Sequence, residues 1–332
     1  MKTTCISIVN YNGNKDTYSC ISSIMGDEIF KDSTIFILDN HSDFDQVCRL
    51  EKYIQNLSGI RKYVGACEDM LHLSGDYDIV LIKSNQNLGF AKGNNFILDL
   101  SIALGYDYSV LINNDTSYEG SSIRTVIKLL DSHLEIGAAT LGIEYYWNPG
   151  HIWNAGGKIF FGYKKYFTTK YIQNKRKQGF DYIDTQFMSG CFIAVRNKII
   201  EKYGTLSERF FFGEEDYEFS YRMKKNGVKC VSVIGATIYH KVNQSLKKIE
   251  NLQGRILVYD LNKLIDMKYS MGKVKFVFFR LSYQCVIYLR FLRMGKLLYG
   301  YRYIRKLMGL VKNHSCVDAK LTFRLWNEGK EI

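Results

Sequence analysis

The first 115 residues alternate between short apolar runs and longer amphipathic stretches. The apolar runs are Cys5–Val9, Ile35–Leu38, Ile79–Ile82 and Val110–Ile112. They are mostly rich in Ile and Val, and the stretches between them are long enough for helices. This pattern is typical of parallel strands buried on both faces. We therefore expect a β-α-β-α arrangement around a mostly parallel sheet.

Each of these runs is followed by polar residues. The four strand ends read Asn10-Tyr11-Asn12, Asp39-Asn40, Asn85-Gln86-Asn87 and Asn113-Asn114-Asp115. Asn and Asp are also ordinary turn and cap residues, so a single polar strand end would indicate little. Because the carboxyl ends of parallel strands meet at one edge of a sheet, where ligands bind, the four together predict a binding site.

The pattern changes after residue 135. Further strands are expected at Gly137–Tyr146, Ile159–Tyr163, Phe187–Val195 and Cys230–Tyr239, some of them antiparallel. From about residue 246 onward the pattern is typical of helices. We expect an α/β fold in which a smaller antiparallel part and a helical C-terminal region follow the parallel sheet.

Composition excludes several classes of protein. Of the 332 residues, 46% are apolar or aromatic and 23% are charged, so a large packed core is expected and a disordered or collagen-like chain is not. The eight cysteines are dispersed and form no C-x-x-C, which argues against a zinc knuckle or a disulfide scaffold and suits a reducing compartment. Neither a G-x-G-x-x-G nor a P-loop motif occurs.

The net charge of +12 is unevenly distributed. Residues 267–317 hold eleven Lys or Arg and no acid, and residues 145–180 hold seven and no acid. The rest of the chain is mildly acidic, which points to an anionic partner such as a nucleic acid, a phosphorylated ligand or a membrane surface. No signal peptide is expected, and no uncharged apolar stretch approaches the length of a membrane-spanning helix.

An ordered set of motifs between residue 5 and about residue 245 carries a family resemblance. The motifs are Ile8-Val9-Asn10-Tyr11-Asn12, Ile37-Leu38-Asp39-Asn40-His41-Ser42, the segment 87–95 (NLGFAKGNN), Leu111-Ile112-Asn113-Asn114-Asp115, Gly190-Cys191-Phe192-Ile193, and the segment 206–218 (LSERFFFGEEDYE) with Arg222. Together they resemble an inverting glycosyltransferase of family 2, and most closely the rhamnosyltransferase-like branch that builds bacterial surface polysaccharides.

This resemblance implies a fold and a division of the chain. The fold is the Rossmann-like A-type fold of glycosyltransferases (GT-A). Residues 1–250 would form the catalytic domain, with a nucleotide-binding half at 1–115 and an acceptor half at 116–250. Residues 251–332, which no motif covers, would form a basic amphipathic helical region.

The resemblance assigns donor-binding residues to the strand ends. Asp39 would hold the nucleotide base, since a carboxylate accepts hydrogen bonds from a pyrimidine N–H or from ribose hydroxyls. A helix cap is the alternative reading of Asp39. Further contacts to the nucleotide are expected from a set of amides and glycines, in which the glycines would let the backbone approach the ligand: Asn10, Asn12, Asn87, Gly89, Gly93, Asn94 and Asn114.

A metal site is expected where the family usually has D-x-D or N-x-D. Here the sequence is Asn113-Asn114-Asp115, with a single carboxylate. Asp115 would bind Mg²⁺ or Mn²⁺, which neutralises the leaving diphosphate. His240, at the end of the strand expected at Cys230–Tyr239, would complete the metal shell, although a lone His is often structural.

The catalytic residues are expected at the start of an amphipathic helix, in Glu214-Glu215-Asp216. The resemblance makes Asp216 the general base that takes the proton from the acceptor hydroxyl, and Glu215 a residue that positions the acceptor. One base is enough for an inverting single displacement. Acids are also favoured at helix starts by the helix dipole, so a structural role is the alternative.

The basic C-terminal region has an apolar stripe at helical spacing. It consists of Val274, Val277, Phe278, Leu281, Cys285, Tyr288, Leu289 and Leu292, and the opposite side mixes Phe279, Tyr283 and Ile287 with basic residues. Lys, Arg and aromatic residues together are typical of a helix that lies on an anionic membrane. A helical subdomain packed against the body is the alternative.

These features predict an enzyme at the inner face of the plasma membrane, cytoplasmic and peripheral. Its donor would be a nucleotide sugar, with dTDP-rhamnose preferred and UDP-galactose, UDP-glucose and UDP-N-acetylhexosamine open. Its acceptor would be a lipid-diphosphate-linked oligosaccharide of O-antigen or capsule synthesis. Two other classes stay open, a non-catalytic protein that binds sugar nucleotides and a basic nucleic-acid-binding protein, although no nucleic-acid partner is expected since no such motif is present.

Overall fold

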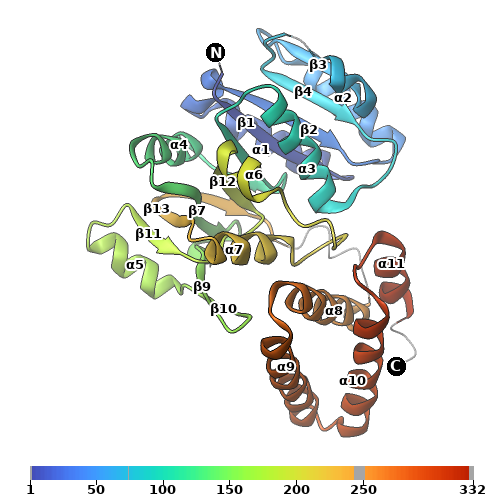
Figure 1. Cartoon of the computed structure of the whole chain (residues 1–332). Helices are drawn as coiled ribbons and strands as arrows, with labels where there is room; N and C mark the ends of the chain where they lie inside the picture. Colours follow the sequence, from blue (N-terminus) through green and yellow to red (C-terminus); the bar gives the residue numbers. More distant parts are fainter. Residues whose placement is uncertain (1, 74, 243–250, 329–332) are drawn as a thin grey trace.

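The computed structural model describes residues 2–73, 75–242 and 251–328 (Figure 1). Its strands are β1 (Thr4–Asn10), β2 (Ser33–Asp39), β3 (Lys62–Ala66), β4 (Ile79–Lys83), β5 (Tyr108–Ile112), β6 (Thr116–Ser117), β7 (Ile136–Tyr145), β8 (Asn148–Asn154), β9 (Gly157–Phe160), β10 (Tyr163–Tyr166), β11 (Tyr182–Thr185), β12 (Phe192–Arg196) and β13 (Lys229–His240).

The helices are α1 (Asn14–Met25), α2 (Phe44–Asn56), α3 (Gly89–Ala103), α4 (Ser122–Ser132), α5 (Thr169–Lys177), α6 (Asn197–Tyr203), α7 (Glu215–Lys225), α8 (Leu252–Ser270), α9 (Lys273–Arg293), α10 (Leu297–Asn313) and α11 (Ala319–Glu328), with the 3-10 helices η1 (Glu28–Asp32) and η2 (Cys67–His72). The C-terminal region is therefore helical, as expected.

One large sheet runs in the order β11-β13-β7-β12-β5-β1-β2-β4-β3, with β6 paired to β13 and β8 paired to β7. The half formed by β5, β1, β2, β4 and β3 is parallel. Strand β12 is antiparallel to both of its neighbours, β5 and β7. A separate antiparallel hairpin consists of β9 and β10. The mixed α/β architecture confirms the fold class predicted from the sequence.

Helices cover both faces of the sheet because its strands are apolar on both. On one face, Ile6 and Ile8 of β1 belong to a buried cluster that includes side chains of α1, α2 and α4. On the other face, Cys5 of β1 and Phe36 of β2 are buried with residues of α3. The apolar residues of α6 and α7 continue this second layer beside β12.

Most of the expected strands form, with two exceptions. The four early apolar runs became β1, β2, β4 and β5. The expected strand Ile159–Tyr163 is wrong, because the chain reverses at Phe161 and Gly162, both with positive φ (44° and 84°), between β9 and β10. The strand expected at Phe187–Val195 starts only at Phe192. The edge strand β3 was not expected from the sequence.

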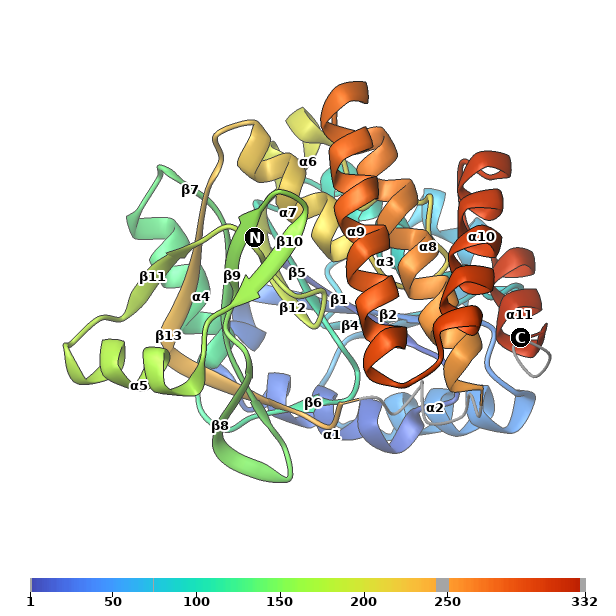
Figure 2. The same cartoon turned by 90° about the horizontal axis from the view of Figure 1, so that it is seen from below.

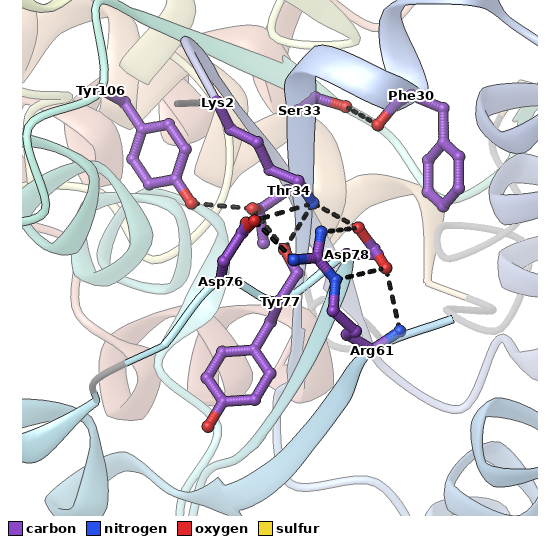
Figure 3. A network of polar contacts seen from close by, with 9 residues as sticks. All are labelled: Lys2, Phe30, Ser33, Thr34, Arg61, Asp76, Tyr77, Asp78 and Tyr106. Carbon is purple, nitrogen blue, oxygen red and sulfur yellow. Dashed lines mark hydrogen bonds and ion pairs between the residues drawn. The ribbon is translucent and has the colours of Figure 1, made fainter. Parts of the chain in front are cut away.

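The amino ends of the parallel strands are tied together by charged residues (Figure 3). Asp78, just before β4, accepts hydrogen bonds from Lys2 Nζ at 2.6 Å and from Arg61 Nη2 at 2.8 Å. Lys2 precedes β1 and Arg61 precedes β3, so one carboxylate joins three strand starts. This cluster lies at the end of the sheet opposite the polar carboxyl ends.

The C-terminal helices lie at one side of the sheet (Figures 1 and 2) and share a buried core that also includes Ile159 of β9 and Tyr217 of α7. Asp260 of α8 accepts hydrogen bonds from Tyr283 of α9 at 2.8 Å and from Tyr303 of α10 at 2.7 Å. Phe279, Tyr283 and Ile287 are buried in this core, so they are the inward face of α9. The stripe beginning at Val274 and Phe278 faces outward, with 70% and 63% of those side chains exposed. Among the described helices, none is long and apolar enough to cross a membrane.

Candidate active site

The nucleotide-binding residues expected from the sequence gather where β1 and β2 end. The two strands are in register, with Asn10 opposite Asp39. Asn10 Nδ2 donates to Asp39 Oδ2 at 2.8 Å. The Ser42 hydroxyl donates a hydrogen bond to Asp39 Oδ2 at 2.8 Å, and the Ser42 backbone N–H donates one to Asp39 Oδ1 at 3.0 Å. Both Asn10 and Asp39 are almost fully buried, so the carboxylate has a fixed orientation.

Amide side chains extend this network to the end of β5. Asn114 Nδ2 donates to the Thr17 hydroxyl at 2.9 Å, and that hydroxyl donates to Asn10 Oδ1 at 2.8 Å. Asn12 adopts a positive φ of 50°, and its side-chain oxygen accepts the backbone N–H of Asp43 at 2.8 Å. Asn10, Asn12, Asp39 and Asn114 are thus brought together as expected.

The loop before α3 is held by Asn40. Asn40 Nδ2 donates to Asn87 Oδ1 at 3.0 Å, and Asn87 Oδ1 also accepts the backbone N–H of Gly89 at 2.9 Å. Gly89 has a φ of 78°, and a Cβ there would lie 2.4 Å from the carbonyl oxygen of Phe211. Glycine at this position is therefore required by packing within the protein.

Gly93 and Asn94 lie deeper, against the sheet. A Cβ on Gly93 would meet Val9 at 3.2 Å, so this glycine allows α3 to approach β1 closely. Asn94 Oδ1 accepts the hydroxyl of Ser7 at 2.9 Å, and Asn94 is buried. These contacts attach α3 to β1, so the positions of both residues are accounted for within the protein.

Asp115 and His240, the two expected metal ligands, are neighbours. Strand β6 pairs with β13 so that Thr116 is opposite His240. Asp115 Oδ1 lies 3.0 Å from His240 Nε2, and only 12% and 6% of the two side chains are exposed. No hydrogen bond is aligned on Asp115 Oδ1 or on His240 Nδ1, although both atoms are buried. The ring nitrogen that faces Asp115 is Nε2, so Asp115 Oδ1 and the Nε2 of a neutral His240 form an oxygen and nitrogen donor pair that suits a divalent cation.

Two protein ligands do not complete a coordination shell. Within residues 2–73, 75–242 and 251–328, no group of three or more His, Cys, Asp or Glu could hold a metal ion. A cation at Asp115 and His240 would need further ligands, such as phosphate or water oxygens. The residues present fit a metal that is shared with a ligand.

Asp216 lies in the first turn of α7 and is partly accessible, with 21% of its side chain exposed. Its Oδ2 accepts the backbone N–H of Gly190 at 3.2 Å. The next residue, Cys191, accepts the backbone N–H of Asn113 at 3.0 Å through its carbonyl oxygen. Hydrogen bonds to the adjacent residues Gly190 and Cys191 therefore link Asp216 with the loop that carries Asn114 and Asp115.

Glu215 precedes Asp216 and is buried, with Oε2 lacking a hydrogen-bond partner. Burial, and then the charge of Asp216, raise the pKa of Glu215 to about 8. At neutral pH Glu215 is therefore mostly a neutral carboxylic acid, which can donate a hydrogen bond. The neighbouring carboxyl groups thus differ in burial and in the partners they have.

Two lysines of this site were not predicted. Lys164 of β10 lies 3.9 Å from Asp216, and Lys263 of α8 lies 2.7 Å from Glu214. Neither lysine belongs to a sequence motif. Lys164 stands in the basic segment 145–180, whose charge was interpreted as a sign of an anionic partner, and Lys263 lies beyond the region of family resemblance.

An open groove of about 1190 Å³ lies elsewhere, between α1, α4 and β13. Its walls include Tyr18, Tyr53 and Tyr239. None of the residues expected to bind donor, metal or acceptor lines it. The residues that could perform chemistry are therefore at the carboxyl edge of the sheet and not in this groove.

The sequence of the chain matches a known protein family. The model described as glycosyltransferase like family 2 matches residues 59–257, more than half of the chain. The chain belongs to this family. The matched region contains Asp115, Asp216 and His240. No curated protein sequence matches the chain.

Solved structures show the same fold at low sequence identity. GalNAc-T7, in a structure with UDP, GalNAc and Mn²⁺, is similar with a TM-score of 0.60 and 14% identity over 98% of this chain and 56% of that one. This chain thus spans little more than half the length of GalNAc-T7. TarS 1–349 of S. aureus, in complex with UDP, is similar with a TM-score of 0.53 and 11% identity over 88% of this chain and 72% of that one.

Proposed function

We propose that the enzyme transfers a sugar from a nucleoside-diphosphate sugar to an acceptor hydroxyl with inversion at the anomeric carbon. The observation that carries this proposal is a pair of backbone hydrogen bonds. The N–H of Gly190 bonds to Asp216 and the carbonyl of Cys191 bonds to the loop of Asp115, so the two acids are linked through adjacent residues. In this transfer the base acts on the attacking hydroxyl and the diphosphate leaves from the same anomeric carbon. The groups that serve these two roles must therefore lie close to each other. The enzymes of similar fold that were solved with UDP support a nucleotide donor.

The nucleoside would be held where β1 and β2 end. Asp39 is fixed by Asn10 and Ser42, and its oxygens retain lone pairs for a base N–H or a ribose hydroxyl. Asn12, Asn87 and Asn114 border the same edge and offer amide groups. This edge is where ligands bind to open parallel sheets.

Asp216 would be the general base. It is the partly exposed carboxylate of the acid triplet, whereas Glu215 is buried and mostly neutral. It would take the proton of the acceptor hydroxyl as that oxygen attacks the anomeric carbon and the bond to the diphosphate breaks. Glu215, as a neutral acid, would donate a hydrogen bond that positions the acceptor.

A divalent cation, Mg²⁺ or Mn²⁺, would be held by Asp115 and His240 together with the donor. When bound, it neutralises the charge that develops on the leaving diphosphate. GalNAc-T7, of the same fold, was solved with Mn²⁺, which supports this assignment. Asp115 Oδ1, which is buried 3.0 Å from His240 Nε2 and has no aligned hydrogen bond, supports it from within this chain.

For the donor we propose dTDP-rhamnose, with UDP-galactose, UDP-glucose and UDP-N-acetylhexosamine as alternatives that the UDP-bound neighbours favour. For the acceptor we propose a lipid-diphosphate-linked oligosaccharide of the kind assembled into O-antigen or capsule. An acceptor carried by a membrane lipid requires an enzyme that reaches the membrane surface. We propose that the outer face of α9 makes this contact with the membrane.

We propose that α9 and α10 rest on the anionic cytoplasmic face of the inner membrane. Residues 267–317 carry eleven cations and no acid, and the outward stripe of α9 exposes Phe278, Leu281 and Leu289 at 63%, 49% and 49%. Exposed apolar side chains among cations are typical of a helix at a membrane interface. The inward face of α9 is already occupied by the helical core, so the outer stripe is available.

Thermal-shift measurements against a panel of nucleotide sugars, with and without Mn²⁺, test the proposed function. We expect one donor to raise the melting temperature, and Mn²⁺ to increase this shift. Release of the nucleoside diphosphate from that donor then separates an enzyme from a protein that only binds. Binding without turnover would favour the non-catalytic alternative, and stabilisation by nucleic acid but by no sugar nucleotide would contradict the proposal.

A further inference from the structure

We propose that Lys164 is a positioning residue for Asp216, which keeps that carboxylate oriented and charge-compensated within a buried cluster of acids. This inference rests on the proposed function, in which Asp216 is the base. Lys164 belongs to no motif of the chain. Its position, and not its sequence context, indicates the role.

Asp216 is held from two sides. Lys164 Nζ lies 3.9 Å from Asp216 Oδ1, and the backbone N–H of Gly190 donates to Asp216 Oδ2 at 3.2 Å. The two carboxylate oxygens therefore face different partners, a backbone N–H at hydrogen-bond distance and an ammonium at ion-pair distance. The Lys164 side chain is only 13% exposed, so this contact is shielded from water.

The surroundings of Lys164 favour its charged form. Burial alone would lower the pKa of Lys164, but the negative charges of Asp216 and Glu214 outweigh it and raise the pKa above its usual value. The ammonium also lies 4.6 Å from the ring centre of Phe187 and 5.5 Å from that of Tyr217. Such aromatic faces stabilise a cation.

Charges in the cluster balance only when Lys164 is included. Glu214 is paired with Lys263, and Glu215 is mostly neutral at pH 7 because its pKa is raised to about 8. Asp216 is then the carboxylate that Lys164 compensates. Further titratable groups around Lys164 and its partners include Tyr166, Tyr217, Tyr259, Asp266 and Glu218.

The β9–β10 hairpin brings Lys164 to this point. Lys164 is opposite Ile159 in the hairpin, and Lys224 of α7 donates to the carbonyl oxygen of Ile159 at 2.6 Å. Since side chains alternate along a strand, Lys165 points to the other face and is exposed. Lys165 therefore provides a matched control.

The test compares Lys164→Met, Lys164→Arg and Lys165→Met in the full chain. The assay is release of nucleoside diphosphate from the donor found in the thermal-shift panel, with water or an added sugar as acceptor. Donor affinity is measured separately by calorimetry, and folding by the melting temperature. Each rate is measured from about pH 5.5 to 9.5 to cover the range in which carboxylates of perturbed pKa titrate.

For Lys164→Met we expect kcat at pH 7 to fall about 10-fold or more. We also expect the acid limb of the pH profile to move up by about one pH unit, which corresponds to a factor of 10 in proton affinity. Donor affinity should stay within about two-fold, because the base contacts the acceptor and not the donor. Lys164→Arg should recover much of the rate, and Lys165→Met should behave as the wild type.

Three results would overturn the proposal. These are an unchanged rate in Lys164→Met, a loss that is equal at every pH, or a loss that Lys164→Arg does not relieve at all. If the wild type itself turns over no sugar nucleotide, the proposed function has failed instead, and the variants then have no rate to compare. The wild-type measurement therefore distinguishes the two failures.

Discussion

Lys263 Nζ lies 2.7 Å from Glu214 Oε1, and this buried ion pair joins α8 to the residue that precedes α7. Glu214 has a φ of 78°, in the left-handed region that residues other than glycine rarely adopt. Asn262, next to Lys263, donates to the carbonyl oxygens of Phe212 at 2.9 Å and Gly213 at 3.2 Å. Helix α8 thus holds the strained turn that leads into Glu215 and Asp216.

Removing Lys263 should destabilise the protein strongly. Lys263→Met leaves Glu214 buried without its cation, and breaking one side of a buried ion pair typically costs about 3–5 kcal/mol. We expect a loss of this size in urea unfolding. Lys275→Met, an exposed lysine of α9, is the control and should change stability little. The double variant Glu214→Gln/Lys263→Met should recover part of the loss, and a Lys263→Met protein as stable as the control would contradict this role.

The proximity of Asp115 and His240 predicts that donor affinity depends on a divalent metal. Donor binding by the wild type should be tighter with Mn²⁺ than with a chelator, and Asp115→Ala should abolish most of the difference. Titration calorimetry of the donor in both conditions measures this. Asp43→Ala, an exposed acid before α2, should keep the metal effect. Equal wild-type affinity in Mn²⁺ and chelator would exclude a metal role for Asp115.

The outer stripe of α9 predicts binding to anionic vesicles. Each cation near such a surface contributes up to about 1 kcal/mol, and salt should weaken the attraction because the Debye length falls to about 3 Å at 1 M. Phe278→Asp and Leu289→Asp should reduce sedimentation with vesicles that contain phosphatidylglycerol. Phe44→Asp, an 80% exposed residue of α2, should not. Equal binding to neutral and anionic vesicles would contradict the proposed surface.

Asp78 predicts a loss of stability in acid. Burial alone would raise the pKa of Asp78, but hydrogen bonds from Arg61 and Lys2 outweigh it and hold the pKa below its usual range. The carboxylate therefore stabilises the fold above the unfolded-state pKa of about 3.9, and this contribution is lost as the pH falls below that value. The melting-temperature gap between wild type and Asp78→Asn should be widest near neutral pH and should narrow progressively as the pH falls below about 4. The control is Asp184→Asn, which changes an exposed carboxylate of β11 and should leave the melting temperature close to that of the wild type at every pH. A pH-independent difference for Asp78→Asn would contradict the ion-pair explanation.

Much of the fold was predictable because it depends on local patterns. Continuous Ile- and Val-rich runs became β1, β2, β4 and β5, and their register brings Asn10 opposite Asp39. The edge strand β3 was missed because Lys62 and Tyr63 are only half-buried and do not form an apolar run. The turn at Phe161 and Gly162 was missed because Gly162 is a single glycine within an apolar and aromatic run, and Phe161 gives no sign of its positive φ in the sequence.

The site was predictable only where it lies on strand ends or helix starts. Asp115 and His240 were expected as partners and lie 3.0 Å apart, although a metal there is still a proposal. Lys263 could not be predicted, since it meets Glu214 from 49 residues away. In α9 the sequence shows two apolar faces, one with Val274 and one with Phe279. Periodicity cannot decide which of them α8 and α10 cover, and the structure buries the face with Phe279.

The assignment of Asp216 as the base is tested most directly by Asp216→Asn. The substitution keeps the size of the side chain but removes its basicity, and the donor contacts at β1 and β2 should be unaffected. General-base contributions are typically ~10²–10⁴-fold, so we expect kcat for nucleoside-diphosphate release to fall by at least about 100-fold while donor affinity stays within about two-fold. A variant that keeps more than about a tenth of the wild-type kcat, well outside that range, would show that Asp216 is not the base.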